Sequence, residues 1–472
     1  MNPDLAGICT PGCPELPAVI AGIQRTAASI AACRAAVGQL ADPTRRAVEL
    51  ASATGATLED VRAAYSLLRS DQAVGALTAS LFYPHRLTHR LAVRTTAEWA
   101  AEPARLDRLL AGQPVLAKTV EIHPSRGTCN YCCAMCLWSD KTTLTYATQG
   151  LQGRGLLSTQ QWLDTIEDLR AHGVQTLVIS GGGEALLNPD LPVILRRARE
   201  MGLRTQLYTT GYNLRRAAPD VWEEVARMHQ VRLSIHSPTE ATYAQITGLR
   251  VELRALRRVS EHARRLLDLR DRLGSPLRLG IGFVLMAVNH REIVAMLDFA
   301  AELDVDFLDI RKDEVDVTEG LSAGELAAVR RQLIDVRDRA RRGDYGALEV
   351  DFSDELVSLA NDRPVVRRRT HECLAKYVRP TISPFGIVAP CDLKAEPRFA
   401  ASQFNLALMP QPTGDMLDAM GRTFVPDACA QCMPSSRTAN AVYAKLLGDA
   451  REGIDPCDQP FHDPAPHVRS RI

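Results

Sequence analysis

The chain has 472 residues, a length that predicts two or three domains rather than one. Acidic and basic residues number 56 each, and this balance argues against a nucleic-acid-binding protein or one held to a membrane surface by charge. No apolar run is long enough to span a membrane and the first residues do not resemble a signal peptide, so we expect a cytoplasmic protein that binds a small molecule.

Residues 1–115 are predicted to form an N-terminal helical domain. Between residues 16 and 112, Ala, Leu and Arg recur with the 3.6-residue period of a helix. The pattern is interrupted at Pro43, Gly55 and Pro84, where we expect helices to end.

Residues 116–360 are predicted to form an α/β domain. Short β-branched runs alternate with amphipathic helical stretches, which is typical of βαβ units around a parallel sheet. Six units predict a partial (β/α)6 barrel, with ligands at the carboxyl ends of its strands. A charged helix over 322–342 and a short strand over 347–354 are expected next. The strands expected in the six units are 118–123, 176–180, 204–209, 231–235, 278–285 and 306–310.

A cluster of cysteines follows the first expected strand. Cys129, Cys132, Cys133 and Cys136 are four of the chain's 12 cysteines, and thiols so close together without a signal peptide are typical of metal ligands. Cys129, Cys133 and Cys136 have C-x3-C-x2-C spacing, which supplies three ligands to a four-iron cluster and leaves one iron open. A register that uses Cys132 in place of Cys133 is a second interpretation. Zinc is a third, although a structural zinc site needs four ligands.

Glycine and polar residues follow the next three expected strands. Gly181–Gly183 end the second strand, where bare backbone would let a ligand lie close, although a tight turn is the simpler interpretation. Thr210 ends the third strand and Ser234 the fourth, and each hydroxyl is a candidate for ligand binding or for capping the next helix. His236 is a candidate for proton transfer, with a hydrogen-bonded structural histidine as the alternative.

Charged residues are dense at the end of the sixth expected strand, over residues 309–314. A solvated loop is the default interpretation. If Arg311 points into the mouth of the barrel, it would bind a ligand carboxylate or a substrate oxygen, and Asp313 beside it would act as an acid or base.

Residues 361–472 are predicted to hold a second metal site. The chain brings four more thiols to this region, namely Cys373, Cys391, Cys429 and Cys432. Four thiolates suit an iron–sulfur cluster or a zinc ion.

Two motifs together resemble the signature of the radical S-adenosylmethionine (SAM) superfamily: CNYCCAMC at residues 129–136 and SGGGEALLNP at residues 180–189. The resemblance implies a TIM-like partial barrel in which Cys129, Cys133 and Cys136 hold a [4Fe–4S] cluster. SAM would bind the open iron and be cleaved to a 5′-deoxyadenosyl radical. An external electron donor of the flavodoxin or ferredoxin type would be needed.

The same resemblance assigns roles to residues at the rim of the barrel. Gly182, Gly183 and Glu184 match the element that contacts the methionyl amino group of SAM. Thr210 and Ser234 stand where relatives hold its ribose and carboxylate, and Arg311 is a further candidate for the carboxylate.

The four C-terminal cysteines resemble the twitch domain, a shortened SPASM domain that carries one auxiliary [4Fe–4S] cluster. This implies a second cluster bound by Cys373, Cys391, Cys429 and Cys432, with zinc as the alternative.

A narrower resemblance predicts the reaction. The helical N-terminal region and residues 208–214 and 231–248 resemble radical deaminases of desosamine biosynthesis, whereas the C-terminal cysteines resemble radical aminocyclitol dehydrogenases. Both features together resemble the radical diol-dehydratases of apramycin biosynthesis. The implied reaction is 3′-deoxygenation of a paromamine-like aminosugar in an aminoglycoside antibiotic pathway, giving a deoxy ketone for a partner NAD(P)H-dependent reductase.

Two other functions stay open. A radical SAM dehydrogenase would oxidise a secondary alcohol of an aminocyclitol or aminosugar. A non-catalytic zinc or iron scaffold would need no SAM.

Overall fold

The computed structural model describes most of the central part of the chain. It covers residues 115–136 apart from 116, 126 and 127, residues 156–313, 320–353 and 375–395, and positions 108, 356, 359, 360 and 373. Nearly all of these belong to one compact unit, formed by Pro114–Leu356 and His371–Ser436. The helical domain expected over residues 1–115 lies almost wholly outside the described residues, so the three-domain division stays a prediction.

The strands that the structure describes form one nine-stranded sheet, in the order β7-β6-β5-β4-β3-β2-β1-β8-β9. Every neighbouring pair is parallel except β8 and β9. Strands β1 to β7 follow one another in space as they do in sequence, which is the arrangement of repeated βαβ units. The strands are β1 (Thr119–Ile122), β2 (Thr176–Ile179), β3 (Arg204–Thr209), β4 (Gln230–Ser234), β5 (Arg278–Leu285), β6 (Phe307–Lys312), β7 (Glu349–Phe352), β8 (Thr381–Ile382) and β9 (Val388–Ala389).

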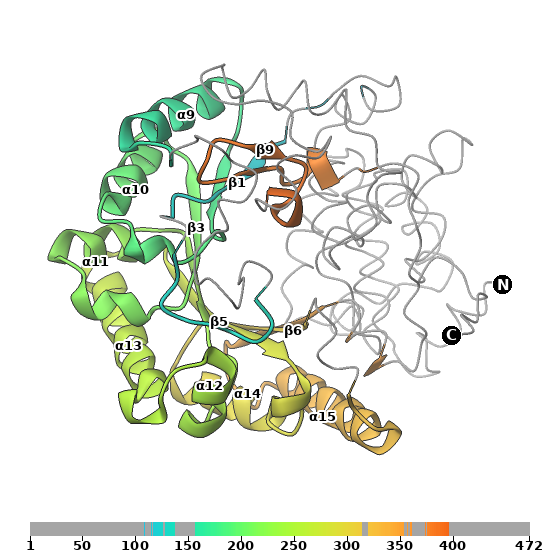
Figure 1. Cartoon of the computed structure of the whole chain (residues 1–472). Helices are drawn as coiled ribbons and strands as arrows, with labels where there is room; N and C mark the ends of the chain where they lie inside the picture. The colour runs from blue at the N-terminus through green and yellow to red at the C-terminus, as the bar shows by residue number, and fades with distance from the viewer. Residues whose placement is uncertain are drawn as a thin grey trace, which may run out of the picture. The chain divides into compact units, whose positions relative to one another are not determined.

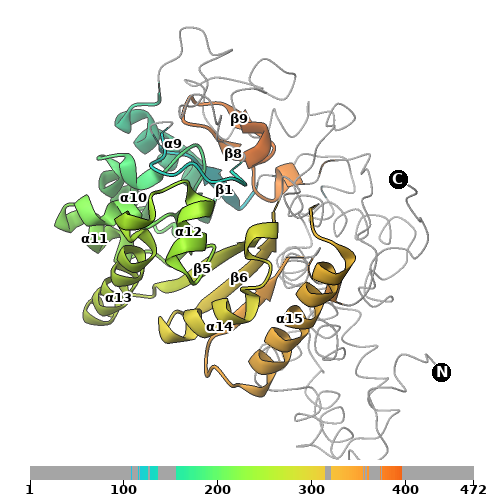
Figure 2. The same ribbon diagram turned by 60° about the horizontal axis from the view of Figure 1, so that its bottom comes forward.

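Helices cover the outer face of this curved sheet, so the predicted α/β partial barrel is confirmed (Figure 1). Figure 2 shows α14 and α15 side by side next to β6. The α-helices are α9 (Thr159–Ala171), α10 (Leu191–Glu200), α11 (Pro219–Ala226), α12 (Glu240–Thr247), α13 (Ala255–Leu273), α14 (Ile293–Glu302) and α15 (Ala323–Arg342). Short 3-10 helices are η1 (Ala185–Leu187), η2 (Tyr212–Arg216), η3 (Val251–Leu253), η4 (Ala287–Asn289), η5 (Ala375–Tyr377) and η6 (Asp392–Ala395).

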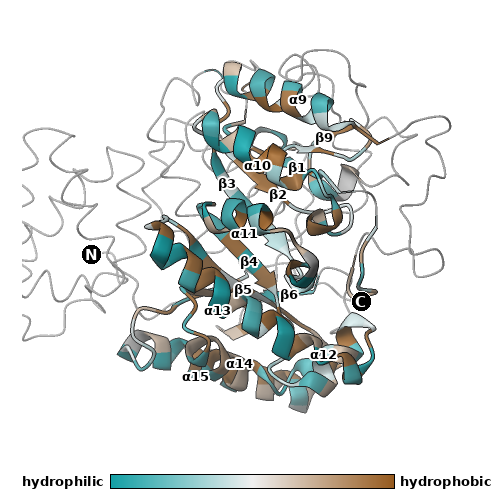
Figure 3. Cartoon of the chain, turned by 90° about the vertical axis from the view of Figure 1, so that its left-hand side faces the viewer, coloured by the Kyte–Doolittle hydropathy of each residue, from teal (hydrophilic) through white to brown (hydrophobic). Residues whose placement is uncertain are grey.

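Local sequence signals explain where the long helices begin and end. Ser158 and Gln161 form a capping box at the start of α9, and Ser322 and Glu325 do the same for α15. The chain leaves α15 at Gly343, whose φ of 76° suits glycine. Figure 3 shows both colours on α10, α11 and α13 and brown on the strands behind them, as expected for helices with one buried face.

The two faces of the central strands have different neighbours. A side chain placed at Gly211 would meet Leu233 of β4 and Val259 of α13, so Leu233 points toward the helices. Because side chains alternate along a strand, Arg232 and Ser234 of β4 point to the opposite, inner face. The inner face of the barrel therefore holds polar residues, whereas Leu233 and its apolar neighbours pack under the helices.

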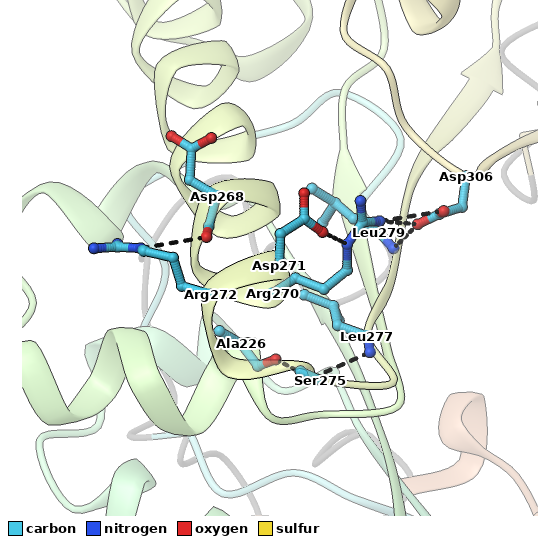
Figure 4. Close-up of polar contacts among 9 residues, drawn as sticks. All are labelled: Ala226, Asp268, Arg270, Asp271, Arg272, Ser275, Leu277, Leu279 and Asp306. Carbon is cyan, nitrogen blue, oxygen red and sulfur yellow. Dashed lines mark hydrogen bonds and ion pairs between the residues drawn. The ribbon is translucent and has the colours of Figure 1, made fainter.

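Hydrogen bonds and an ion pair connect the amino ends of β5 and β6 to neighbouring helices and to each other (Figure 4). The Asp306 carboxylate accepts a hydrogen bond of 2.7 Å from the backbone N–H of Leu279 and pairs with Arg270 of α13 at 3.2 Å. The Ser275 hydroxyl donates to the carbonyl of Ala226, at the end of α11. These contacts stabilise the end of the barrel opposite the one where ligands are expected.

The segment after residue 375 extends the sheet. Strand β8 pairs with β1 in parallel, and the Glu121 backbone N–H also donates to the carbonyl of Pro380 at 2.9 Å. Strand β8, from the region assigned to the C-terminal domain, thus lies beside the first strand of the barrel, and β9 pairs with β8. None of the described helices combines the length and apolar character that a membrane crossing requires.

Candidate functional site

The cysteine loop, residues 128–136, leaves the carboxyl end of β1 and is held from two sides. The Glu184 backbone N–H, just after β2, donates to the carbonyl of Thr128 at 2.9 Å. The Cys132 backbone N–H donates to the carbonyl of Thr247, the last residue of α12, also at 2.9 Å. The glycine motif is therefore hydrogen-bonded to the residue that precedes the cysteine motif, about fifty residues earlier in the chain, at the rim of the barrel.

The thiols of the loop influence one another. Burial raises the pKa of the Cys133 thiol well above its ordinary value, and the neighbouring Cys136, Cys129 and Cys132 raise it further. Burial and the Glu184 carboxylate raise the pKa of Cys129 to about 12. Without a metal the thiols of Cys129 and Cys133 are protonated at neutral pH, and cluster binding would release their protons.

The residues around the loop fit an iron–sulfur cluster. Soft thiolates are the donors that iron–sulfur clusters use, and Cys129, Cys133 and Cys136 are partly buried and free of disulfides. In the described residues no three His, Cys, Asp or Glu side chains are arranged as a closed metal site. The side-chain amide nitrogen of Asn130 is buried without a hydrogen-bond partner, which leaves a donor beside Cys129 for a bound group.

The glycines after β2 are required by the protein's own packing. A Cβ atom at Gly183, where φ is 114°, would lie 2.3 Å from the carbonyl oxygen of Thr128. At Gly181 it would lie 2.4 Å from the ring of His123. The carbonyl of Gly182 accepts a hydrogen bond from the hydroxyl of Ser125. The sequence predicts that a ligand lies against these glycines. In the structure the absence of their side chains leaves space for the protein segment that leads into the cysteine loop.

Glu184 is almost fully buried and links the ends of β2 and β3. One carboxylate oxygen accepts from the Thr209 hydroxyl at 2.6 Å and from the Leu186 backbone N–H at 3.0 Å. The other accepts from the Thr210 backbone N–H at 2.8 Å. The structure thus brings Glu184 and Thr210 together at the rim.

The two hydroxyl candidates at the rim lie at the ends of adjacent strands. The Thr210 hydroxyl accepts a 3.4 Å hydrogen bond from the backbone N–H of Tyr212, the first residue of η2, although Gly211 is the N-cap of that helix. Ser234 is half-buried on the inner face of β4, and its carbonyl accepts from the Tyr243 hydroxyl at 3.3 Å. Both remain candidates for cofactor binding.

His236 has the contacts of a structural histidine. Its Nδ1 accepts a 3.2 Å hydrogen bond from the Val284 backbone N–H, which assigns the proton to Nε2. Burial, with a smaller effect of Arg232, lowers its pKa to about 3. The imidazole is therefore neutral at pH 7 and does not act there as an imidazolium acid.

The charged end of β6 is ordered by ion pairs. Arg311 contacts Asp309 at 3.4 Å, and 38% of its side chain is exposed. Asp313 is fully buried, with the Lys312 ammonium 3.8 Å from its carboxylate. Arg311 and Asp313 thus lie at the carboxyl end of β6, where the sequence places them.

Sequence reasoning missed two clusters. Glu121 of β1 pairs with Arg379 at 3.1 Å and with His123 at 3.0 Å. Burial raises the pKa of Glu121, but Arg379 and then His123 outweigh burial and lower it to about 2. The second cluster surrounds Tyr208 and Arg232 on the inner face. Its only sequence signal is that both residues alternate with buried apolar positions in their strands.

The second predicted metal site is described in part. Cys373 and Cys391 are partly buried and form no disulfide, and Cys391 lies two residues after the end of β9. Cys429 and Cys432 lie outside the described residues, so this four-cysteine site stays a prediction.

Comparison with known proteins gives consistent results. Residues 125–300 match the family model described as the radical SAM superfamily. The dTDP-4-amino-4,6-dideoxy-D-glucose ammonia-lyase of Streptomyces venezuelae is 28% identical over 261 residues, 54% of this chain and 52% of that protein. The PqqA peptide cyclase of Streptomyces rochei is 28% identical over 247 residues, 50% of this chain and 60% of that protein. The chain thus matches little more than half the length of these curated relatives.

Among solved structures, SuiB of Streptococcus suis superimposes with a TM-score of 0.51 and 16% identity. The match covers 77% of this chain and 81% of SuiB. At this identity the likeness concerns the fold, and it supports the partial barrel.

Proposed function

We propose, from the match of residues 125–300 to the radical SAM family model, that the protein is a radical SAM diol-dehydratase that acts on an aminosugar. The proposed substrate resembles paromamine, and the proposed product is the deoxy ketone left by 3′-deoxygenation. The observation that carries the proposal is the hydrogen bond from Glu184 to Thr128, which joins the cysteine loop to the glycine element at the rim.

The proposed cofactor site uses residues from four strand ends. Cys129, Cys133 and Cys136 would hold a [4Fe–4S] cluster. Gly182, Gly183, Glu184, Thr210, Ser234 and Arg311 would surround SAM. When bound, the two groups supply a carbon-centred radical that removes a hydrogen atom from an unactivated C–H bond.

The residues of the inner face would then direct the substrate radical. Removal of hydrogen from a carbon that bears a hydroxyl leaves HO–C•, beside a carbon with a second hydroxyl. Loss of one hydroxyl proton and of the neighbouring hydroxide gives O=C–C• and water. One electron and one proton complete the deoxy ketone.

Electrons would come from an external donor of the flavodoxin or ferredoxin type. Cys373, Cys391, Cys429 and Cys432 would hold an auxiliary [4Fe–4S] cluster, or zinc as the alternative, and a cluster there would offer an electron route. A separate NAD(P)H-dependent reductase would reduce the ketone. This partner is proposed because the reaction ends at a carbonyl group.

Dehydration is favoured over oxidation by the lyase among the relatives, since its name describes elimination of ammonia from an aminosugar. Elimination of ammonia and elimination of water both remove a group next to a radical centre. A dehydrogenase would instead oxidise the same HO–C• radical to a ketone and keep the second hydroxyl.

The mass of the sugar product tests the proposal. Anaerobically reconstituted enzyme is incubated with paromamine, SAM and a reductant, and the products are analysed by mass spectrometry. Dehydration gives a product lighter by one water molecule. A product lighter by two hydrogens, with all oxygens kept, would replace the dehydratase by the dehydrogenase. Zinc without iron or sulfide would favour the scaffold.

A further inference from the structure

The inner face of the barrel carries charged residues where branched apolar side chains usually fill a barrel. Tyr208 of β3 and Arg232 of β4 are register partners, so their side chains lie next to each other on this face. The Arg232 guanidinium carbon lies 3.7 Å from the centre of the Tyr208 ring. This stacked arrangement is a close cation–π contact.

Arg232 is fixed from the far side as well. It pairs with Asp309 of β6 at 3.2 Å, and their side chains are only 15% and 17% exposed. Strand β5 lies between β4 and β6. A Cβ atom at Gly282 of β5 would lie 3.0 Å from the Arg232 side chain. Because Gly282 has no side chain, Arg232 has space to cross β5 and reach Asp309. A stacked ring, a carboxylate and a missing side chain together hold one guanidinium in place.

Tyr208 faces several charges from the elements packed against it. These are Arg232 of β4, Asp309 and Arg311 of β6, and Arg379 before β8. Burial raises the pKa of the Tyr208 phenol and Asp309 adds to this, but the three guanidinium groups outweigh both and lower the pKa. Within the described residues its hydroxyl makes no hydrogen bond to the protein.

Three other titratable groups near the rim are less suited to exchanging protons with a substrate. His236 is neutral, and its Nδ1 accepts from the backbone. Glu121 is almost fully buried and paired with Arg379 and His123. Glu184 accepts three hydrogen bonds from its own neighbours.

We propose that Tyr208 is the proton-transfer residue of the barrel interior, and that Arg232, held by Asp309, is its positioning residue. The proposal rests on the proposed dehydration and names the group that moves its protons. The Tyr208 hydroxyl protonates the departing hydroxide, so the C–O bond breaks and water leaves. The phenolate, paired with Arg232, then accepts the proton of the remaining substrate hydroxyl.

The step balances without a further reactant. HO–C•–C–OH becomes O=C–C• plus water, and Tyr208 ends in the phenol form in which it began. The radical electron moves from one carbon to the next, so no oxidant or reductant is consumed. One residue can serve both hydroxyls because they are on adjacent carbons.

The test compares Tyr208→Phe with Tyr345→Phe, using paromamine labelled with deuterium on its aminosugar ring. Tyr345 is a suitable control, because it too lies beside a carboxylate, Asp298, and a guanidinium, Arg339, but it precedes the amino end of β7 and is not at the rim. Water loss should fall about 10²- to 10⁴-fold in Tyr208→Phe, the usual contribution of a general acid–base group. Transfer of deuterium to 5′-deoxyadenosine should continue in this variant. Tyr345→Phe should show both water loss and deuterium transfer at the wild-type rate.

A second measurement does not depend on turnover. The phenolate absorbance of Tyr208, taken as wild type minus Tyr208→Phe, is followed as the pH is raised. In Arg232→Gln the midpoint should move upward toward about 10, the ordinary value for tyrosine, and the alkaline limit of the water-loss activity should move with it. Arg232→Lys keeps a positive charge, so the Tyr208 midpoint in this variant should lie between those of the wild type and Arg232→Gln.

Unchanged water loss in Tyr208→Phe, or an unchanged Tyr208 midpoint in Arg232→Gln, would overturn the assignment. A failure of the proposed function looks different, because wild-type enzyme would then release no water from paromamine at all. The absorbance titration still reports on Tyr208 and Arg232 in that case.

Discussion

Glu184 joins the two halves of the site through its backbone and its side chain at once. Its N–H holds the cysteine loop through Thr128, while its carboxylate holds the end of β3 through Thr209 and Thr210. The Glu184 carboxylate accepts all three of its hydrogen bonds, and each of its two oxygens accepts at least one. A change at this residue should therefore affect the protein before any ligand binds.

We predict that Glu184→Gln destabilises the fold. The amide nitrogen of Gln cannot accept a hydrogen bond, so it would face either the Thr210 N–H or the Thr209 hydroxyl as a second donor. A buried donor left unsatisfied costs about 1–3 kcal/mol, and chemical denaturation of the metal-free protein should show a loss of this size. A variant as stable as wild type would mean that these contacts do not form.

At the same scale, His236 should make the protein sensitive to acid. Its pKa falls on folding from the ordinary 6.5 to about 3, so the folded state binds the proton more weakly than the unfolded state. The stability it contributes is complete above about pH 6.5 and is lost as the pH falls toward 3.

His236→Asn should remove this part of the acid sensitivity, because an Asn oxygen can accept the Val284 N–H without titrating. Unfolding free energies of the two proteins measured from pH 7 to pH 5 should converge as the pH falls. If His236 transfers protons during catalysis, as its position in the sequence suggested, turnover at pH 7 should collapse in this variant. We expect it to stay within a few-fold of wild type.

At the scale of elements, the cysteine loop is positioned by close backbone approaches. Gly183 abuts the carbonyl of Thr128, and Gly248, at the end of α12, would carry a Cβ atom 3.2 Å from the Cβ atom of Cys132. The loop is therefore clamped between the end of β2 and the end of α12. The loop backbone can adopt this position because Gly183 and Gly248 have no side chains that would clash with it.

Gly183→Ala should displace the loop and reduce cluster loading. The added Cβ atom would need to move the Thr128 backbone, which starts the loop. Gly202→Ala is the matched control, since Gly202 also has a positive φ, 69°, but nothing lies within 4 Å of its Cβ position. Iron and sulfide per chain after anaerobic reconstitution should fall in the first variant and not in the second. Equal loading in both would show that the clamp is unimportant.

Strand β8 is held to β1 by a buried ion pair as well as by the sheet. Arg379→Met should leave the Glu121 carboxylate buried without its cation, and breaking such a pair costs roughly 3–5 kcal/mol. Hydrogen exchange at β8 should accelerate, while exchange at β3 and β4 should keep its wild-type rate. Faster exchange throughout the sheet would instead indicate global destabilisation.

At the scale of the whole molecule, the strands with strong local patterns could be predicted from the sequence. Strand β4 was expected at 231–235 and forms at Gln230–Ser234, because apolar Val231 and Leu233 alternate with polar neighbours. The cysteine and glycine motifs each follow an expected strand, which places both at the carboxyl edge of the sheet, and there the Glu184 backbone N–H donates to the carbonyl of Thr128.

Contacts between distant segments could not be predicted in the same way. Strand β8 has two residues and no periodic pattern of its own, and its partner β1 is more than 250 residues earlier in the chain. Arg232 and Asp309 are 77 residues apart, and each alone resembles an ordinary charged residue within a strand. They pair because the curved sheet brings β4 and β6 close on its inner face. No local sequence pattern indicates that curvature.

The central claim is that the rim of this barrel directs a radical at a hydroxylated sugar held below it. Transfer of deuterium from ring-labelled paromamine into 5′-deoxyadenosine, measured by mass spectrometry, tests this claim most directly. We predict labelled 5′-deoxyadenosine with the wild-type enzyme and none when Cys129, Cys133 and Cys136 are all changed to Ala. Unlabelled 5′-deoxyadenosine from the wild-type enzyme, or labelled product from the triple variant, would contradict the account.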